Sequence, residues 1–450
     1  MNKKLYVEKS MDKEQLHQLN TLMNAIPLFG KKVGLHNIEM MIALMNHTLP
    51  ISSYLESVHV IHVTGTNGKG SVCKMLSEIY DAGGYKVGLF TSPHIDVITE
   101  RVQINNENVS GELFYEAYQC VKRICHELKE KGVESTFFEW MFSIALYCFC
   151  KKELDVLIIE VGIGGRLDTT NVLPQKDLSV ITSIGLDHQD ILGETLLDIA
   201  KEKVGILQKK GRLVIGNIDK EAEELIRQIA VKKEAIVCKI QPYDYKIIDF
   251  TDKSIDFSVH NKYYNYECLR LNTCARYQLE NASISLMCVY ALRHVIPVKE
   301  EEVISGLNQF FWPGRLEQIH DGIYIDGAHN VLGMTTLIET LKTVFSAQPL
   351  DLLIGMKQHK DYTRVIQLLI NSGLFKEVYL VDLSMGKGIE KEVLYSEVIK
   401  YTNAVYYIEN LDAFFKERLR EQRSSILLAT GSLFLTSDIR KIFQEEAIHD

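Results

Sequence analysis

The sequence lacks three features that would each point to a particular class of protein. Its nine cysteines include no CxxC pair, which argues against a zinc site or a disulfide framework and suits reduced thiols in a cytoplasm. Positive charge is not in excess, because 50 Lys and Arg stand against 59 Asp and Glu, a formal net charge of −9. Broad binding to nucleic acid is therefore not expected.

The third missing feature is an apolar run of membrane-spanning length. The longest run, at 137–150 (FFEWMFSIALYCFC), contains Glu139 and is shorter than the roughly 20 residues that a membrane span needs. We expect a buried helix there. Residues 1–15 carry basic side chains with no apolar segment behind them, so no secretory signal is expected. We therefore expect a cytoplasmic protein with no membrane partner.

What the sequence does contain is a regular alternation of short β-branched runs and longer amphipathic segments. Its 450 residues favour two or three domains. Continuous apolar strands are expected at 59–63, 86–90, 155–161, 178–184, 212–216, 351–355, 377–381, 404–408 and 425–430. Strands of this kind separated by helices are typical of α/β domains with mainly parallel sheets.

Two segments in the middle of the chain depart from this alternation. Residues 241–270 combine alternating polarity with turn residues, which predicts a small antiparallel sheet. Residues 277–295 predict a helix, and the proline and charged run that follow predict a linker near residue 297. The expected domains are therefore 1–297 and 298–450.

A glycine-rich stretch, VTGTNGKGS at 63–71, follows the first predicted strand. Gly65, Gly68 and Gly70 leave room for a ligand against the main chain. Backbone N–H groups that open into a helix form a nest for an anion. Lys69 can then reach the terminal phosphates of a nucleotide, and the Ser71 hydroxyl can bind magnesium.

The spacing of this stretch differs from that of the usual phosphate-binding loop. Only Thr66 and Asn67 separate the first glycine from the glycine–lysine pair, where four residues are usual, and Gly70 separates the lysine from the serine. A glycine-rich turn without a ligand is the alternative. The order of strand, lysine, serine and helix favours phosphate binding.

HVTGTNGKGS resembles the nucleotide loop of the Mur ligase superfamily, and in particular its folylpolyglutamate synthase/dihydrofolate synthase branch. Seven further stretches resemble signatures of that branch, in its order: 28–45, 91–105, 160–172, 183–206, 312–317, 326–330 and 430–440. The resemblance implies an N-terminal P-loop-containing ATPase domain of Mur ligase type, with a mainly parallel sheet. It also implies a C-terminal Rossmann-like α/β domain that serves as the glutamate ligase domain.

The resemblance further implies a two-step reaction. ATP phosphorylates a carboxylic acid to an acyl phosphate, and the amine of L-glutamate then displaces phosphate. The implied acid is dihydropteroate, a reduced folate, or both. Because the acid and the triphosphate are both anions, cations and backbone dipoles must neutralise them, and the resemblance implies two magnesium ions.

Three residues are implied at the metals. Glu160 ends a predicted strand, and magnesium prefers oxygen ligands such as its carboxylate. His188 would be taken for a hydrogen-bonding loop residue on chemistry alone, but the resemblance implies a ligand of the second magnesium. Lys203 matches a lysine that the family often carries as a carbamate; a surface lysine that pairs with Glu202 or Asp198 is the alternative.

The acid-binding side is implied at the four residues of LDTT, Leu167 to Thr170, and at Thr136. Leu167, Asp168, Thr169 and Thr170, together with Thr136, resemble residues that line the pterin site. The loop at 91–101 resembles one that closes over folate and the phosphates, and it contains His94. For Thr136 and His94, ordinary helix-start and loop roles are equally good interpretations.

The remaining implied contacts concern ATP and glutamate. Gln278 and Asn281 match residues that contact adenine, but Tyr277 stands where the family has histidine. Arg315 is implied at the phosphates, where a fork of donors suits oxygen anions. The resemblance places Asp326 at the ribose, and two residues, His329 and Ser432, at glutamate.

Other functions remain open at this stage. Another Mur-type amide ligase could use a different acid or amino acid. A nucleotide-gated scaffold would bind ATP without chemistry, but it has no need of the metal and lysine set described above. A simple P-loop kinase would release a phosphorylated acid without requiring glutamate. We expect a monomer.

Overall fold

The computed structural model describes residues 21, 23, 26, 34–241, 245–346, 348–358, 361–384, 388–421 and 423–446. They form two compact units, one with residues up to 184, 188–244 and 280–310, the other with 185–187, 245–279 and 311 onwards. The first unit thus extends past the linker expected near residue 297. The reason is that helix α11 (Glu300–Gln309) packs on helix α4 (Lys69–Ala82). A Cβ atom at Gly306 would lie 2.5 Å from Ile79 Cα.

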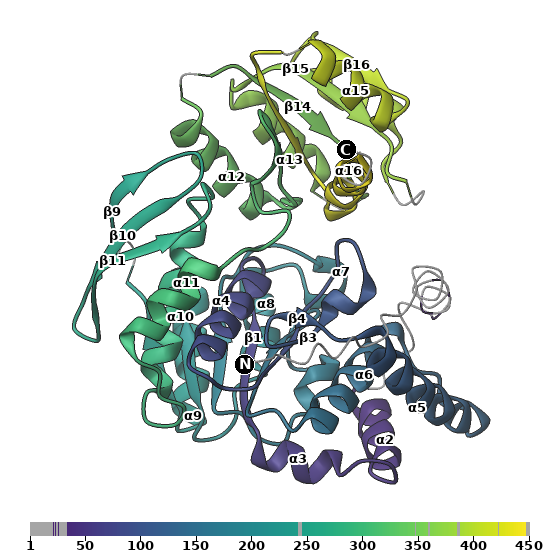
Figure 1. Cartoon of the computed structure of the whole chain (residues 1–450), viewed down its shortest axis with the longest axis vertical. Helices are drawn as coiled ribbons and strands as arrows, with labels where there is room; N and C mark the ends of the chain where they lie inside the picture. The colour runs from purple at the N-terminus through teal and green to yellow at the C-terminus, as the bar shows by residue number, and fades with distance from the viewer. Residues whose placement is uncertain are drawn as a thin grey trace, which may run out of the picture. The chain divides into compact units, whose positions relative to one another are not determined.

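The sheet of the first unit has eight strands in the order β4-β3-β2-β5-β1-β6-β7-β8 (Figure 1). Their bounds are β1 His59–Thr64, β2 Val87–Phe90, β3 Val102–Ile104, β4 Glu107–Asn108, β5 Val156–Glu160, β6 Leu178–Ile181, β7 Arg212–Ile215 and β8 Ile236–Lys239. Only the β2–β3 and β3–β4 pairs are antiparallel. The five strands expected from apolar runs are all present, and the predicted mainly parallel sheet is confirmed.

Of the described helices in this unit, α4, α6 (Phe137–Lys152) and α9 (Lys220–Lys232) pack against the sheet. Besides α11, the others are α2 His36–Met45, α3 Ile51–Ser57, α5 Gly111–Glu130, α7 Gln189–Leu192 and α8 Leu196–Val204, with 3₁₀ turns η1 Ile98–Arg101 and η2 Thr169–Val172. The expected buried helix is α6. Its Phe142 and Phe149 share one core with Val60, Leu157 and Ile159 of the sheet. None of the described helices is both long and apolar enough to span a bilayer.

Helix α10 (Gln278–Leu292) confirms the helix predicted at 277–295, and its first residues belong to the second unit. The predicted antiparallel sheet is also present in that unit, as β9 Tyr245–Phe250, β10 Ile255–His260 and β11 Asn265–Leu271. Of the signature at 28–45, residues 28–33 lie outside the described residues.

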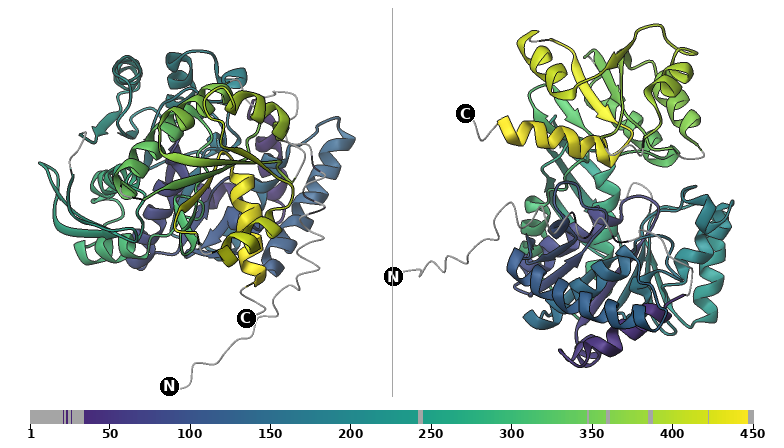
Figure 2. Two further views of the ribbon diagram at one scale, coloured as in Figure 1. Left: turned by 90° about the horizontal axis from the view of Figure 1, so that it is seen from above. Right: turned by 90° about the vertical axis from the view of Figure 1, so that its right-hand side faces the viewer.

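The larger sheet of the second unit has six strands in the order β12-β13-β17-β14-β15-β16. Their bounds are β12 Glu317–His320, β13 Ile323–Ile325, β14 Leu350–Ile354, β15 Phe375–Val381, β16 Val405–Ile408 and β17 Ile426–Thr430. Only β12 runs antiparallel to its neighbour. The helices are α12 Val331–Val344, α13 Tyr362–Asn371, α14 Lys391–Val398, α15 Leu411–Glu421 and α16 Leu433–Glu446. The last of them, α16, is the yellow helix next to the C-terminus in Figure 2. The expected two-domain α/β fold is confirmed.

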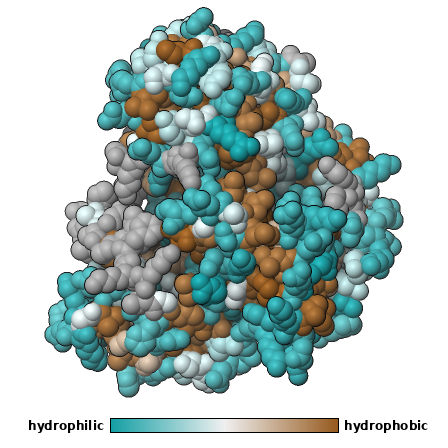
Figure 3. All heavy atoms as spheres, turned by 180° about the vertical axis from the view of Figure 1, so that it is seen from behind, coloured by the Kyte–Doolittle hydropathy of each residue, from teal (hydrophilic) through white to brown (hydrophobic). Residues whose placement is uncertain are grey.

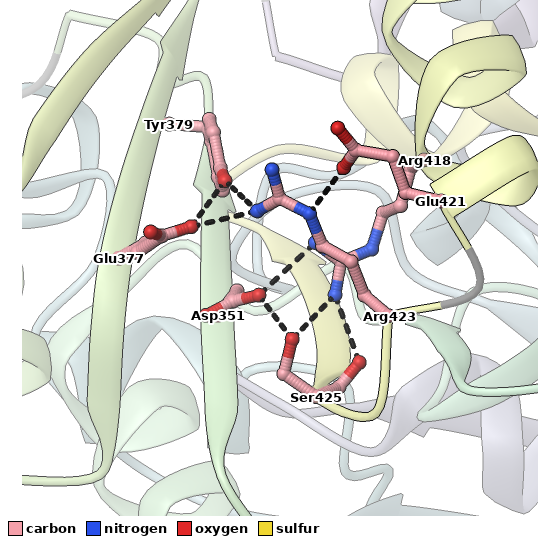
Figure 4. A network of polar contacts seen from close by, with 7 residues as sticks. All are labelled: Asp351, Glu377, Tyr379, Arg418, Glu421, Arg423 and Ser425. Carbon is pink, nitrogen blue, oxygen red and sulfur yellow. Dashed lines mark hydrogen bonds and ion pairs between the residues drawn. The ribbon is translucent and has the colours of Figure 1, made fainter.

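A buried ion pair lies at the amino ends of β14 and β17 (Figure 4). Arg418 of α15 donates from Nη1 to Asp351 Oδ2 at 3.0 Å, and both side chains are almost fully buried. A second guanidinium nitrogen of Arg418 donates to the carbonyl of Ser425 at 2.9 Å. This end of the sheet is therefore tied to α15, and the loops at the carboxyl ends are the ones available for a ligand.

The surface mixes polar and apolar side chains, as the face drawn in Figure 3 shows. The most exposed large apolar side chains include Val231 and Ile236, which are 77% and 61% exposed. They lie at the end of α9 and the start of β8. Single apolar side chains of this kind are normal on a protein surface.

Candidate functional site

The glycine-rich loop lies at the carboxyl end of β1, between two parallel neighbours, β5 and β6. Gly68 precedes helix α4 with φ +83°, a conformation that favours glycine. A Cβ atom there would collide with Asn281 Oδ1, and one at Gly65 would collide with Thr182 Oγ1. Glycine is required at both positions because side chains from elsewhere in the unit occupy the space.

Hydrogen bonds hold this loop in a defined shape. Asn67 donates from its backbone N–H to Ser183 Oγ at 2.9 Å, and its carbonyl accepts from Thr182 Oγ1 at 2.6 Å. Thr66 donates its N–H to the Ser183 carbonyl at 2.9 Å. Sequence reasoning missed Thr182 and Ser183, although their position directly after strand β6 is a signal for residues at the ligand-binding edge.

Lys69 lies over the same loop. Its Nζ donates to the Gly65 carbonyl at 3.1 Å and to the Thr66 carbonyl at 3.2 Å. Lys69, Gly70 and Ser71 are the first residues of α4, so their N–H groups are at the positive end of the helix dipole. The loop therefore offers backbone donors and an ammonium group to an anion.

A buried carboxylate stands beside this loop. Glu160 ends β5 in register with Val63 of β1, and it is 3% exposed. Its Oε2 accepts from Ser92 N–H at 2.9 Å. Ser71, 1% exposed, begins the adjoining helix. A carboxylate and a hydroxyl at one sheet edge are oxygen donors of the kind that magnesium prefers.

Lys203 is buried in α8, with 3% of its surface exposed. The surface lysine considered as an alternative is therefore wrong. Glu202 pairs with Arg166 at 2.8 Å, and Asp198 accepts from the Thr195 hydroxyl at 2.6 Å. A buried lysine is the kind whose chemistry the surroundings can alter.

His188 directly precedes α7 with φ +48°, a left-handed conformation that is uncommon for a residue with a Cβ atom. Such outliers gather at functional sites. No group of three or more His, Cys, Asp or Glu placed to hold a metal occurs within the described part of the chain. The metal role of His188 therefore stays a prediction.

The loop after Glu160 is organised by Asp168, which is 8% exposed. Oδ2 accepts from the N–H groups of Gly162 and Ile163, each at 3.1 Å. Oδ1 accepts from Thr170 N–H at 3.0 Å and from the Thr170 hydroxyl. Burial raises the pKa of this carboxyl, against the opposing effect of these hydrogen bonds. Both oxygens are used within the loop, while neighbouring Leu167 is 46% exposed.

The other residues expected on the acid-binding side also make local bonds. Thr136 caps α6, since its hydroxyl accepts from Glu139 N–H at 3.3 Å while its own N–H donates to Glu139 Oε2 at 2.7 Å. His94 Nδ1 accepts from Arg101 Nε at 2.8 Å. Burial lowers the pKa of Arg101 to about 10. Thr169 is half-buried at the start of η2.

One carboxylate that sequence reasoning missed fixes the loop around His94. Glu100 accepts from the N–H groups of Ile95 at 2.7 Å, Asp96 at 3.0 Å and Val97 at 2.8 Å. Burial raises its pKa. Three consecutive amides on one carboxylate give this loop a fixed shape.

In the second unit, Asp326 follows β13 and is 2% exposed. Oδ2 accepts from Tyr277 Oη at 2.6 Å and from Leu316 N–H at 2.8 Å, and Oδ1 accepts from Ala328 N–H at 2.8 Å. Burial raises the pKa of Asp326, and the charge of Arg315 opposes that effect. Tyr277 therefore has a defined polar partner.

Arg315, His329 and Ser432 surround the same turn. Arg315 Nη1 donates to the Gly314 carbonyl at 3.1 Å, and a Cβ atom at Gly327 would lie 2.6 Å from that nitrogen. His329 Nδ1 lies 2.9 Å from the Gly327 carbonyl. Ser432 is buried directly before α16 and accepts from Phe434 N–H at 3.1 Å.

The two predicted adenine contacts are buried at the start of α10. Gln278 is 1% exposed and Asn281 is 8% exposed. Asn281 lies against Gly68 of the phosphate loop, so it supports that loop. Contact of either residue with adenine stays a prediction.

Comparison with known proteins agrees with this arrangement. Residues 63–289 match the Mur ligase middle domain, and residues 314–433 match the Mur ligase glutamate ligase domain. The dihydrofolate synthase/folylpolyglutamate synthase of Bacillus subtilis (strain 168) is 31% identical over 423 residues, which cover 92% of this chain and 95% of that protein.

Solved structures show the same likeness. The folylpolyglutamate synthase of Thermotoga maritima superposes with a TM-score of 0.81 at 28% identity, covering 96% of this chain and 97% of that one. A complex of FPGS with AMPPCP gives a TM-score of 0.79 at 27% identity, covering 95% and 99%. The chain therefore belongs to the dihydrofolate synthase/folylpolyglutamate synthase family of ATP-dependent Mur ligases.

Proposed function

We propose that this protein joins L-glutamate to dihydropteroate, to the γ-carboxyl of a reduced folate polyglutamate, or to both, with ATP as the energy source. The observation that carries the proposal is the edge formed by β1 and β5. There a glycine loop with Lys69 and a buried Glu160 stand side by side. Family membership supplies the substrate class.

The chemistry has two steps. A carboxylate oxygen of the acid attacks the γ-phosphorus of ATP, and ADP leaves with the electrons of the broken P–O bond. The glutamate amine then attacks the acyl carbon, loses a proton, and phosphate departs from the tetrahedral intermediate. Lys69 and the amides at the start of α4 would hold the phosphates and balance the charge that develops on them.

The oxygen donors at this edge fit magnesium. Ser71 and Glu160 would bind one ion, and His188 would bind a second. When bound, magnesium neutralises phosphate oxygens and orients them for transfer. The burial of Lys203 supports the proposal that this lysine is a carbamate that contributes an anionic oxygen.

We assign the remaining residues by the same resemblance. Arg315 would contact the phosphates, while Asp326 would bind the ribose through the acceptor capacity left on Oδ1. His329 and Ser432 would bind glutamate. Gln278 and Asn281 would approach adenine, and the loop that carries Leu167 and Thr169 would receive the pterin, with Thr136 close by. We propose a cytoplasmic monomer that does not bind nucleic acid.

The test is magnesium-dependent phosphate release from ATP by the purified protein. Dihydropteroate and tetrahydrofolate are supplied separately, each with and without glutamate. We expect release that requires both an acid and glutamate, and the accepted acid identifies the activity. Release with the acid alone would indicate a kinase, and nucleotide binding without release with either acid would contradict the proposed substrate class.

A further inference from the structure

The imidazole of His62 is an unusual side chain for its position. It lies in the middle of β1, between apolar neighbours, and none of its surface is exposed. Its Nε2 lies 2.8 Å from the hydroxyl oxygen of Thr170. Its Nδ1 is buried and has no hydrogen-bond partner among the residues that the structure describes. An apolar side chain would avoid the cost of this unpaired nitrogen.

The direction of the hydrogen bonds around Thr170 is set by Asp168, the acceptor at the end of this series of bonds. The hydroxyl proton of Thr170 goes to Asp168 Oδ1, because a carboxylate only accepts. The hydroxyl oxygen is then left as an acceptor towards His62, so Nε2 carries the imidazole proton. Burial, followed by the charge of Lys176, lowers the pKa of His62 and keeps the ring neutral.

This chain of bonds reaches the loop at 162–170. Asp168, at its end, binds the amides of Gly162 and Ile163, only two and three residues after Glu160. The loop also contacts α8, because Arg166 N–H donates to the Glu202 carbonyl at 2.8 Å. The exposed Leu167 lies between these anchor points. Hydrogen bonds through Thr170 and Asp168 therefore link the loop to a donor in the core of the sheet.

We propose that His62 is a positioning residue which, through Thr170 and Asp168, holds the loop at 162–170 in the shape that receives the acid substrate. This inference rests on the proposed function, since it assigns that loop to the acid. It also explains why the core keeps a histidine with an unpaired nitrogen. The donor at Nε2 is what the site requires.

The first test compares steady-state kinetics and thermal melting of His62→Met, His62→Gln and the wild-type protein. Methionine fills the space without a donor, and the amide nitrogen of glutamine can reach the place of Nε2. We expect His62→Met to raise KM for the acid roughly tenfold, the effect of one lost buried hydrogen bond. KM for ATP and Tm should change little, and His62→Gln should recover most of the loss.

A matched control and a second variant sharpen the comparison. His59 is on the same strand and contacts Asp177 at 3.3 Å, so His59→Met should leave KM for the acid unchanged. Thr170→Val should reproduce the effect of His62→Met. The proposal would be overturned if His62→Met raised KM for the acid and KM for ATP equally and also lowered Tm. It would also be overturned if His62→Gln did not recover the wild-type KM for the acid.

A readout without substrate separates this proposal from the proposed function. Arg166 is exposed within the loop, so the rate of trypsin cleavage after it, relative to other sites in the same digest, reports on loop opening. We expect faster cleavage in His62→Met and Thr170→Val, and the wild-type rate in His62→Gln. Unchanged cleavage would overturn the positioning role even in an active ligase. Altered cleavage in a protein that ligates neither acid would instead count against the proposed function alone.

Discussion

The hydroxyl of Tyr277 donates a 2.6 Å hydrogen bond to Asp326 Oδ2, which joins the start of α10 to the turn after β13. Tyr277 stands where the resemblance described in the sequence analysis implies a histidine. Burial, and then the charge of Asp326, raise the pKa of Tyr277, so the phenol remains a donor. Tyr277 therefore orients Asp326 through this hydrogen bond.

Tyr277→Phe removes that donor and keeps the ring. We expect KM for ATP to rise by up to about tenfold, because Asp326 loses one of three donors and is less firmly oriented. Tm should change little. The control is Tyr324→Phe in β13, a buried ring that packs edge-on against Phe345. Equal KM values in Tyr277→Phe and the wild type would show that Leu316 and Ala328 suffice.

Lys69→Ala tests the phosphate loop. We expect turnover to fall by at least about a hundredfold, because the ammonium group that balances phosphate charge is lost. The melting curve should stay close to wild type, since the bonds that Lys69 Nζ makes go to two carbonyls of its own loop. Phosphate release and thermal melting check both points, with exposed Lys86→Ala as the control. Retained turnover would remove Lys69 from the mechanism.

Glu160→Gln tests the proposed metal ligand. The amide keeps an oxygen that can accept from Ser92 N–H, but it loses the charge that attracts magnesium. We expect the magnesium concentration for half-maximal activity to rise about tenfold or more, a loss of at least about 1.4 kcal/mol in binding. The exposed Glu107→Gln should leave the titration unchanged. A wild-type titration for Glu160→Gln would speak against the assignment.

Gly68→Ala tests why the loop needs glycine. Alanine at φ +83° is strained, and its Cβ atom would collide with Asn281 Oδ1. We expect the free energy of unfolding to fall by about 1–3 kcal/mol and the affinity for AMPPCP to fall as well. Gly84 has φ +80° with open space around it, so Gly84→Ala measures the cost of the backbone conformation alone. Equal effects in the two variants would mean that the contact with Asn281 is unimportant.

The lowered pKa of Lys176 predicts that the stability of the protein depends on pH. Burial lowers its pKa to about 7, against about 10.4 for an unfolded lysine. Between these values the unfolded chain binds a proton that the folded protein does not, so this residue makes stability rise with pH from about 7 to 10. Denaturation across that range should show the rise in the wild type and in exposed Lys86→Met, but a weaker one in Lys176→Met. Parallel curves for all three proteins would contradict it.

Much of the fold could be predicted because its signals are local. Strands β1 and β5 are continuous apolar runs, and the alternation at 241–270 does mark a three-stranded antiparallel sheet. The sequence pattern does not predict β3 and β4, because both are short and β4, at the edge of the sheet, is exposed. Such strands form through pairing with β2, which no local pattern reveals.

For the candidate site too, local features can be predicted from the sequence, and features that depend on tertiary packing cannot. The sequence pattern predicts the loop with Lys69 and Ser71, because strand, glycines and helix are contiguous. It does not predict that Lys203 is buried, since that depends on how α8 packs on the loop at Gly165. Nor does it reveal that Asp168 spends both oxygens on its own loop, because those partners are defined only once the chain has folded.

The interleaving of the two compact units constrains how such an enzyme can be recombined. Residues 245–279 belong to the same compact unit as the residues from 311 onwards. The segment after residue 310 is therefore only part of that unit. A chimaera joined at residue 297 or 310 would inherit Tyr277 from one parent and Asp326 from the other. Where one parent carries histidine at that position, the hybrid would combine a donor and an acceptor that were never selected together.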